Sequence, residues 1–372
     1  MMQLLNSAPK HPSAAISNHL LETLQDIASN VQIQSHFCIR HPNYKPLELP
    51  AESVTHFQRL PVELQHKYLN LQLQGFLYGI YYNGSMRDAL TPEAEPGSVA
   101  LPPNLENNSL LGIDMEFYER LHQSNRGEGY FDPGWQVMRQ ESDGSLAVTK
   151  GGLTLHVERV PHLQDAQHAA VAGDIVALRM PKNLLQNGFY MAVGNAGRAQ
   201  QSNDNSVTVR IYFHLTAEGA VAVMSSLTRR LNDIKIPFNF KVLYNPTDYQ
   251  RYDSGVLYFE RNYYPVVRQL LQAVYVENQI HFQTEVPLFT KQLAPGLAVA
   301  EEPDRKFTTQ ESFGMNRCQI IANGLLQSWY QGETSPVQRL TSIVQNFSSL
   351  GIELERPFLN AGSEDIYPLI DL

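Results

Sequence analysis

Residues 207–215, VTVRIYFHL, decide the fold, because apolar and polar side chains alternate along them without a break. Successive side chains of a β-strand point to opposite faces of the sheet. One face of this predicted strand is therefore apolar, and the other carries Arg210, Tyr212 and His214. This polar face is either a half-solvated sheet surface with an incidental histidine or part of a site.

A second strand with the same alternation follows at residues 238–243, FNFKVL. Its apolar side chains face inward, and Asn239 and Lys241 lie on the opposite side. A lysine among apolar neighbours is suited to act as a general base, because burial disfavours its charged form. The alternative is an edge-strand lysine that discourages aggregation. The spacing does not decide between them.

Short β-branched segments between glycine-rich turns predict a largely antiparallel sheet from residue 129 onward. The expected strands are 135–139, 153–157, 174–180, 189–193, 207–214, 238–243 and 256–259. Helical spacing of apolar residues predicts helices at 217–232, behind Thr216 as N-cap, and at 263–276, 312–327 and 335–348. The predicted fold class is α+β, with a largely antiparallel sheet flanked by helices.

The N-terminal part is predicted to be helical. Apolar residues recur at helical spacing in residues 14–30 and 61–82, and the second helix has a favourable proline at its start. Proline, glycine and glutamate concentrate in residues 91–106, which predicts a linking loop. We therefore expect a helical region at 1–125 and a mixed α+β domain at 126–372.

Composition narrows the class of protein. The chain has 372 residues, a net charge of −9 and only two cysteines, Cys38 and Cys318. The negative charge argues against broad affinity for nucleic acid or an anionic membrane, and with two cysteines we expect no disulfide framework. No apolar run is long enough to span a membrane, and the first thirty residues lack the pattern of an export signal. We expect a cytoplasmic protein, although an effector secretion signal would escape these criteria.

Two further segments contain residues suited to bind phosphate. Arg251 and Tyr258 follow the second strand, and an arginine binds phosphate through two parallel hydrogen bonds. Arg251 is equally able to pair with Asp248 or Asp253 at the surface. Residues 309–325 predict a helix that begins at Ser312, whose free N–H groups lie close to Arg317 and suit an anion. An ordinary capped helix explains the same segment.

Familiar catalytic motifs are absent from the sequence. It has no phosphate loop of the GxxxxGK[ST] type, no GxSxG and no HExxH, and GNAG at 194–197 lacks the dinucleotide-binding spacing. We therefore predict activity without a metal, nucleotide or other cofactor.

Several blocks together resemble the HopA-type effector family. They are GDIVALRMPKNL, FYMAVGNAG, RIYFHLTAEGA, LTRRLNDIKIPFNFKVL, YQRYDSGVLYFERN, LAPGLAVAEEP and SFGMNRC. They run in order between residues 125 and 367, nearly two-thirds of the chain. Members of this family are similar in active-site logic to phosphothreonine lyases and to the lyase domains of lanthipeptide synthetases.

The resemblance implies a phosphoserine/phosphothreonine lyase that eliminates phosphate from a peptide to give dehydroalanine or dehydrobutyrine. Lys241 falls where the lyase lysine abstracts the α-proton, and His214 falls where the lyase histidine protonates the leaving phosphate. Phosphate binding would fall to Arg210, Arg251 and Arg317, with Tyr258 helping to position it. Tyr212 occupies the position, two residues before the histidine, where the lyases commonly carry a lysine.

The resemblance also implies partners. In ribosomal-peptide maturation a kinase-like phosphotransferase supplies the phosphorylated precursor peptide. Two other functions remain open: a non-catalytic effector that only binds a partner, which would fit the departure at Tyr212, and a leader-peptide recognition protein, which would fit the helical N-terminal part.

Overall fold

The computed structural model describes residues 16–34, 37–93, 112–197 and 207–371. Residues 94–106 of the predicted linking loop lie outside these ranges. Within them the chain is α+β, with antiparallel sheets and a helical N-terminal region, so the predicted class is confirmed. Cys38 and Cys318 are free thiols, and both are buried. No helix among the described residues is long and apolar enough to cross a membrane.

The main body is built on a seven-stranded antiparallel sheet. Its strands in spatial order are β13 (Lys291–Ala294), β14 (Leu297–Glu301), β10 (Thr208–Phe213), β12 (Gly255–Glu260), β11 (Asn239–Leu243), β9 (Phe189–Val193) and β8 (Asn183–Gln186). The strand predicted from residues 207–214 is β10, and it lies inside the sheet. Arg210 and Tyr212 on its polar face are buried, so that face is not half-solvated.

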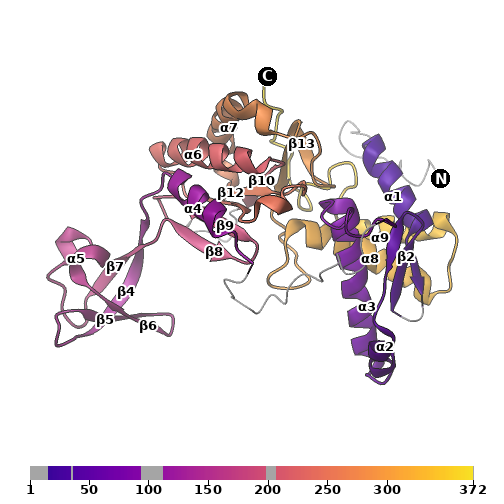
Figure 1. The fold of residues 1–372 in the computed structure, drawn as a ribbon, viewed down its shortest axis with the longest axis horizontal. Coiled ribbons are helices and arrows are strands. Elements are labelled where there is room, and N and C mark those ends of the chain that lie inside the picture. The colour runs from indigo at the N-terminus through magenta and orange to yellow at the C-terminus, as the bar shows by residue number, and fades with distance from the viewer. Residues whose placement is uncertain (1–15, 35–36, 94–111, 198–206, 372) are drawn as a thin grey trace.

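Helices α6 (Ala217–Asp233) and α7 (Tyr264–Asn278) pack together above this sheet, and α4 (Met115–Ser124) lies beside α6 (Figure 1). The prediction of α6 is confirmed: the Thr216 side chain accepts a hydrogen bond from the Gly219 N–H at its start. That bond satisfies one of the free N–H groups at the helix N-terminus. The apolar stripe of α6 is buried, including Leu227 and Leu231.

The N-terminal helices α1 (Asn18–Asn30), α2 (Ala51–Gln58) and α3 (Val62–Leu77) lie beside α8 (Phe313–Tyr330) and α9 (Pro336–Ser349) (Figure 1). Helix α3 packs on α8, and α1 packs on α9. Their apolar side chains join those of the seven-stranded sheet in one core. The predicted boundary near residue 125 therefore does not coincide with a break in the core.

Helix α3 ends in one π-helical turn, η1 (Tyr78–Tyr82), where the helical spacing predicts a continuous α-helix to residue 82. This turn carries Tyr82 against the ring of Tyr212, with 6.5 Å between the ring centroids, and against Phe313 at the start of α8. The N-terminal region thus reaches the polar face of β10. A small unpredicted sheet, β1 (Gln32–Gln34), β2 (Cys38–His41) and β3 (Tyr44–Leu47), precedes α2.

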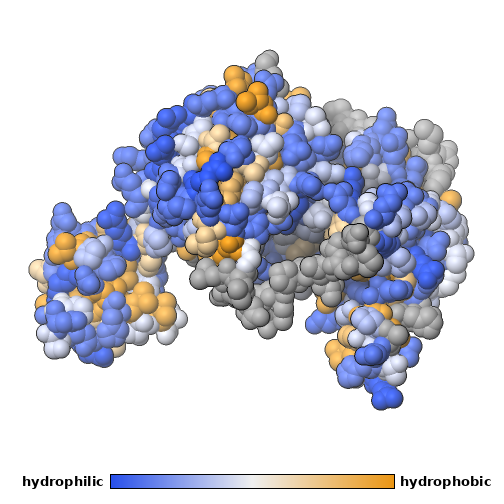
Figure 2. Space-filling model, viewed as in Figure 1, coloured by the Kyte–Doolittle hydropathy of each residue, from blue (hydrophilic) through white to orange (hydrophobic). Residues whose placement is uncertain are grey.

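Residues 130–180 form a separate β-arm that projects from the main body (Figures 1 and 2). Its strands in spatial order are β6 (Leu153–Val157), β5 (Leu146–Lys150), β4 (Tyr130–Gln140) and β7 (Ile175–Met180). The turns α5 (Arg159–His162) and η2 (Asp165–Gln167) connect β6 to β7. A small core of its own, centred on Trp135, holds the β-arm together. Short 3₁₀ turns η3 (Pro246–Asp248), η4 (Arg261–Tyr263) and η5 (Gln279–His281) complete the main body.

Candidate functional site

A pocket opens on the polar face of the seven-stranded sheet, between the sheet, η1 and the start of α8. We call it the sheet pocket. Its lining residues are Tyr78, Tyr82, Phe189, Arg210, Tyr212, Lys241, Arg251, Asp253, Val256, Tyr258 and Ser312. It encloses about 50 Å³. Five of the seven predicted site residues line it: Arg210, Tyr212, Lys241, Arg251 and Tyr258.

The register of the sheet explains why these side chains meet. Tyr212 on β10 lies opposite Val256 on β12, and Val256 lies opposite Lys241 on β11. Residues paired directly across antiparallel strands share a face of the sheet. Tyr212 and Lys241 therefore point to the same side, two strand spacings apart, or roughly 10 Å between backbones. Arg210 lies opposite Tyr258 in the neighbouring row.

Arg251 enters the sheet pocket in an ion pair with Asp253. Its Nε donates to Asp253 Oδ1 at 2.9 Å, and its Nη2 donates to Oδ2 at 3.0 Å. Asp253 is buried and also accepts from the Tyr78 hydroxyl at 3.1 Å and the Asn83 amide at 3.2 Å. Burial alone would raise the pKa of Asp253, but the Arg251 charge and these hydrogen bonds hold it below its ordinary value. The predicted alternative, a pair with Asp253, is thus present, but it lies in the pocket and not at the surface.

Arg210 is anchored in a comparable way. Its Nε donates to Glu302, which also accepts from Lys306 at 2.5 Å. The Arg210 guanidinium lies over the Tyr258 ring, 5.0 Å from the ring centroid. Such anchoring fixes the position of a cation before a ligand arrives, which favours binding of an anion.

Lys241 differs from the two arginines, because no carboxylate among the described residues forms a salt bridge with it. Its Nζ donates to Gln186 Oε1 at 3.3 Å and lies 4.2 Å from the Phe189 ring centroid and 5.6 Å from that of Tyr258. The side chain is partly buried. Three basic side chains, Arg210, Arg251 and Lys241, therefore line the pocket with one acidic side chain, Asp253.

The first turn of α8 adds the positive end of a helix dipole. Ser312 is its N-cap, accepts from the Met315 N–H at 3.3 Å and lines the pocket, as the prediction of a helix entered at Ser312 requires. Gly314 allows the close approach to η1, because an added Cβ would lie 2.2 Å from the Tyr82 ring. Helix N-termini favour anions.

The structure does not bring His214 into the sheet pocket. It follows the end of β10 and is 2% exposed. Its Nδ1 lies 3.0 Å from the Glu285 carbonyl oxygen, and its ring packs against Tyr252 at 5.2 Å between centroids. Burial lowers the pKa of His214 below its ordinary value, which favours the neutral imidazole. Its Nε2 is buried without a hydrogen-bond partner in the described part of the chain.

Arg317 is also outside the sheet pocket. It is 1% exposed, and its guanidinium donates to the carbonyl oxygens of Pro357 at 2.9 Å and Leu359 at 3.0 Å and to the Asn316 side chain at 2.6 Å. Burial lowers its pKa to about 10. These contacts fasten the C-terminal segment to α8, and Arg317 does not line the sheet pocket.

Several lining residues were not predicted from the sequence. Tyr78 and Tyr82 lie in the π turn, and their only sequence signal is an aromatic pair four residues apart in YGIYYNGS. Phe189 begins a predicted strand whose pairing with β11 could not be known from the sequence.

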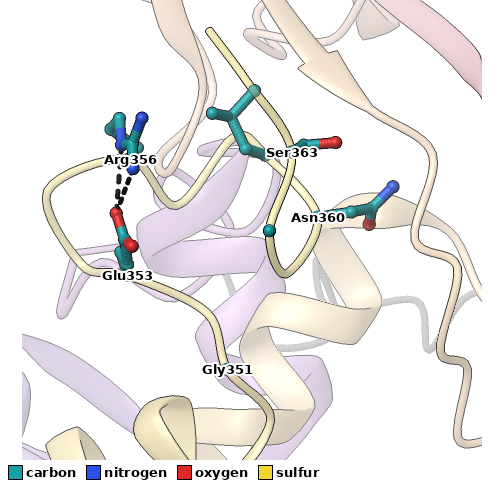
Figure 3. A pocket seen from close by; sticks show the side chains of 7 residues that line it. Gly351, Glu353, Arg356, Asn360 and Ser363 are labelled. Carbon is teal, nitrogen blue, oxygen red and sulfur yellow. Dashed lines mark hydrogen bonds and ion pairs between the residues drawn. The ribbon is translucent and has the colours of Figure 1, made fainter. Parts of the chain in front are cut away.

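A second hollow of about 10 Å³ lies in the loop after α9, lined by Gly351, Glu353, Arg356, Leu359, Asn360, Gly362 and Ser363 (Figure 3). Arg356 points to Glu353, and its Nε donates to Glu353 Oε2 at 3.0 Å. Arg356 and Glu353 thus neutralise each other, and none of the predicted site residues lines this hollow.

A comparison with known protein families finds a match that covers the site. The model of the HopA1 effector protein family matches residues 180–359, a segment that contains all seven predicted site residues. No curated protein matches the chain. The description of this family model names no reaction.

Two solved structures are similar to this chain. The effector protein from Pseudomonas syringae pv. tomato strain DC3000 has 18% identity and a TM-score of 0.39, over 66% of this chain and 80% of that one. The effector protein from Pseudomonas syringae pv. syringae strain 61 has 14% identity and a TM-score of 0.45, over 93% of this chain and 98% of that one.

Proposed function

From the premise that residues 180–359 match the HopA1 effector protein family, we propose that this protein is a phosphoserine/phosphothreonine lyase acting on a peptide. The reaction converts the phosphorylated residue to dehydroalanine or dehydrobutyrine and releases inorganic phosphate. The observation that carries the proposal is the sheet pocket, in which Lys241 faces two anchored arginines and a helix N-terminus.

Phosphate recognition falls to Arg210, Arg251 and the start of α8. A phosphate monoester carries close to two negative charges and accepts several charge-assisted hydrogen bonds. Asp253 takes two of the five N–H donors of Arg251, which leaves three for a ligand. Glu302 takes the Nε of Arg210, and the Arg210 side chain lines the sheet pocket.

Lys241 acts as the base. In its neutral form its Nζ takes the proton from the α-carbon, and the electron pair of the broken C–H bond forms the double bond between the α- and β-carbons. The bond between the β-carbon and the phosphate oxygen breaks, and phosphate leaves with that electron pair. Arg210, Arg251 and the helix dipole stabilise the charge that collects on phosphate.

The test compares Lys241→Met with Lys150→Met on a phosphothreonine peptide. Methionine keeps the length of the side chain and removes the basic nitrogen, and Lys150 lies on the distant β-arm. We expect Lys241→Met to lower kcat about 10²-fold or more, because the base acts only as the C–H bond breaks. The Kd of the phosphopeptide should change little, and Lys150→Met should match the parent.

Retention of the parent kcat by Lys241→Met would refute the assignment of Lys241 as base. Phosphate release and product mass follow the reaction, and a titration with the same peptide follows binding. A coupled loss of binding and activity would instead indicate that Lys241 only holds the ligand.

The substrate must be phosphorylated before this protein acts, so a kinase-like phosphotransferase is a proposed partner. A second candidate function, a non-catalytic effector or peptide-binding protein of the same fold, is favoured by one observation: His214, the expected acid, lies outside the sheet pocket. In that case the parent protein binds the phosphopeptide and returns it unchanged.

A further inference from the structure

We infer that the hydroxyl of Tyr212, and not the imidazole of His214, donates the proton to the departing phosphate. This assignment rests on the proposed lyase reaction. It identifies a second catalytic residue at the position where the resemblance to the lyases would place a lysine.

Position is the first argument. Tyr212 lines the sheet pocket in the same row of the sheet as Lys241, with Val256 between them. A phosphorylated residue bound over Val256 has its α-carbon toward one side chain and its phosphate toward the other. His214 does not line the pocket, and Nδ1 of its ring lies against the Glu285 carbonyl.

The state of the hydroxyl is the second argument. Tyr212 is 2% exposed, and its hydroxyl makes no hydrogen bond of good geometry with any described residue, although Arg210 and Tyr82 lie near it. A buried polar group without a partner is unfavourable, and a phosphate oxygen in the pocket would satisfy it. The neighbouring Tyr78 hydroxyl is instead committed to Asp253.

The protonation state of the Tyr212 hydroxyl suits a proton donor. Burial raises the pKa of the Tyr212 phenol well above its ordinary value, so the hydroxyl keeps its proton at neutral pH. It gives up that proton only to a strong base. Phosphate that leaves as its trianion is such a base, whereas the intact ester is not.

The step balances as follows. The O–H bond of Tyr212 breaks as the bond between the β-carbon and oxygen breaks, and the proton goes to that oxygen of the leaving phosphate. Arg210 lies beside the phenolate that remains. Lys241 holds the proton from the α-carbon, and its transfer through solvent to Tyr212 restores both side chains after the products leave.

The experiment uses two peptides that differ only in the leaving group, phosphoserine and serine O-sulfate. Sulfate is a far weaker base than phosphate, so it departs without a proton. We expect Tyr212→Phe to lower kcat on phosphoserine about 10²-fold or more while lowering kcat on serine O-sulfate less than about 3-fold. Lys241→Met should lower both, because both reactions lose the α-proton.

Tyr275→Phe is the matched control. Tyr275 is buried, its hydroxyl donates to the Pro295 carbonyl at 3.0 Å, and it does not line the sheet pocket. It should keep the parent kcat on both peptides, which separates loss of a catalytic proton from loss of any buried hydroxyl.

Equal losses on the two peptides for Tyr212→Phe would overturn the assignment, as would parent-like kcat on phosphoserine. If His214→Gln lowered kcat on phosphoserine but not on serine O-sulfate, and Tyr212→Phe did not show this difference, the acid would be His214. A parent protein that released neither phosphate nor sulfate would overturn the lyase proposal itself, and this assignment with it.

Discussion

Arg251 and Arg317 show how one residue type takes two roles in this molecule. Each guanidinium is largely buried, but Arg251 spends two donors on Asp253 and keeps a free edge in the sheet pocket, whereas Arg317 donates to main-chain oxygens at Pro357 and Leu359. Although burial lowers the pKa of Arg251, the Asp253 carboxylate raises it above its ordinary value, so its charge is retained. Arg317 is therefore a residue of the core, and Arg251 belongs to the site.

Replacement of Arg317 by leucine should lower stability rather than phosphopeptide affinity. The variant leaves the carbonyl oxygens of Pro357 and Leu359 buried without their donor, and each such loss costs on the order of 1–3 kcal/mol. We expect the free energy of unfolding to fall by about 3 kcal/mol in a urea titration.

Arg268→Leu is the control, because Arg268 also donates to a main-chain oxygen, that of Leu369, but near the surface. It should cost less than about 1 kcal/mol. A folded Arg317→Leu protein of parent stability that had lost phosphopeptide binding would show instead that Arg317 belongs to the phosphate site.

The sequence predicts the position of a single side chain where local periodicity decides on which face of the sheet it lies. Arg210, Tyr212 and Lys241 share a face because alternation along a strand is a local rule. The positions of His214 and Arg317 depend on segments distant in the chain, Glu285 for one and Pro357 to Leu359 for the other. No spacing in the sequence reports such contacts.

At the scale of elements, the start of α8 combines a helix cap with a proposed position for phosphate. Ser312 accepts the Met315 N–H and lines the sheet pocket, so its side chain influences stability and binding together. Two substitutions separate these effects, because aspartate caps a helix as well as serine does and alanine does not.

Ser312→Asp should keep the stability of the parent and weaken phosphopeptide binding about tenfold or more, because a carboxylate then faces the phosphate. Ser312→Ala should lower the free energy of unfolding by about 1 kcal/mol and change Kd less. Thermal unfolding and a binding titration measure the two quantities. Equal affinities for both variants would show that phosphate does not bind at this helix end.

Elements with a local signal were predicted well. Helix α6, with Thr216 as N-cap, and strands β6 and β9 lie where periodicity and capping placed them. Strands β13 and β14 were missed, because β14 is buried along its whole length and its apolar run lacks alternation. The sequence does not distinguish the π turn η1 from a continuation of α3, because its residues keep helical spacing.

At the scale of the whole molecule, the sheet pocket is shared between distant parts of the chain. The sheet supplies Arg210, Lys241 and Tyr258, while the N-terminal region supplies Tyr78, Tyr82 and, through Asn83, a hydrogen bond to Asp253. Together with the common core, this arrangement joins the N-terminal helices and the seven-stranded sheet around one site. The β-arm has its own core and contributes no lining residue to the sheet pocket.

The chemistry proposed for this shared site needs no metal ion. The described residues contain no group of three or more side chains suited to hold one, and the Asp253 carboxylate already accepts from Arg251, Tyr78 and Asn83. Full activity is expected in the presence of EDTA, because Lys241 supplies the base and the two arginines supply the positive charge that the proposed reaction requires.

The central claim is elimination at the sheet pocket, and the fate of a phosphothreonine peptide in ¹⁸O-labelled water with EDTA tests it most directly. Mass spectrometry of peptide and phosphate together distinguishes the possible reactions. We predict a peptide containing dehydrobutyrine and phosphate without ¹⁸O, because the bond between carbon and oxygen breaks. A peptide with threonine restored and ¹⁸O in the phosphate would show hydrolysis and contradict the account, as would a phosphopeptide that is bound and recovered unchanged.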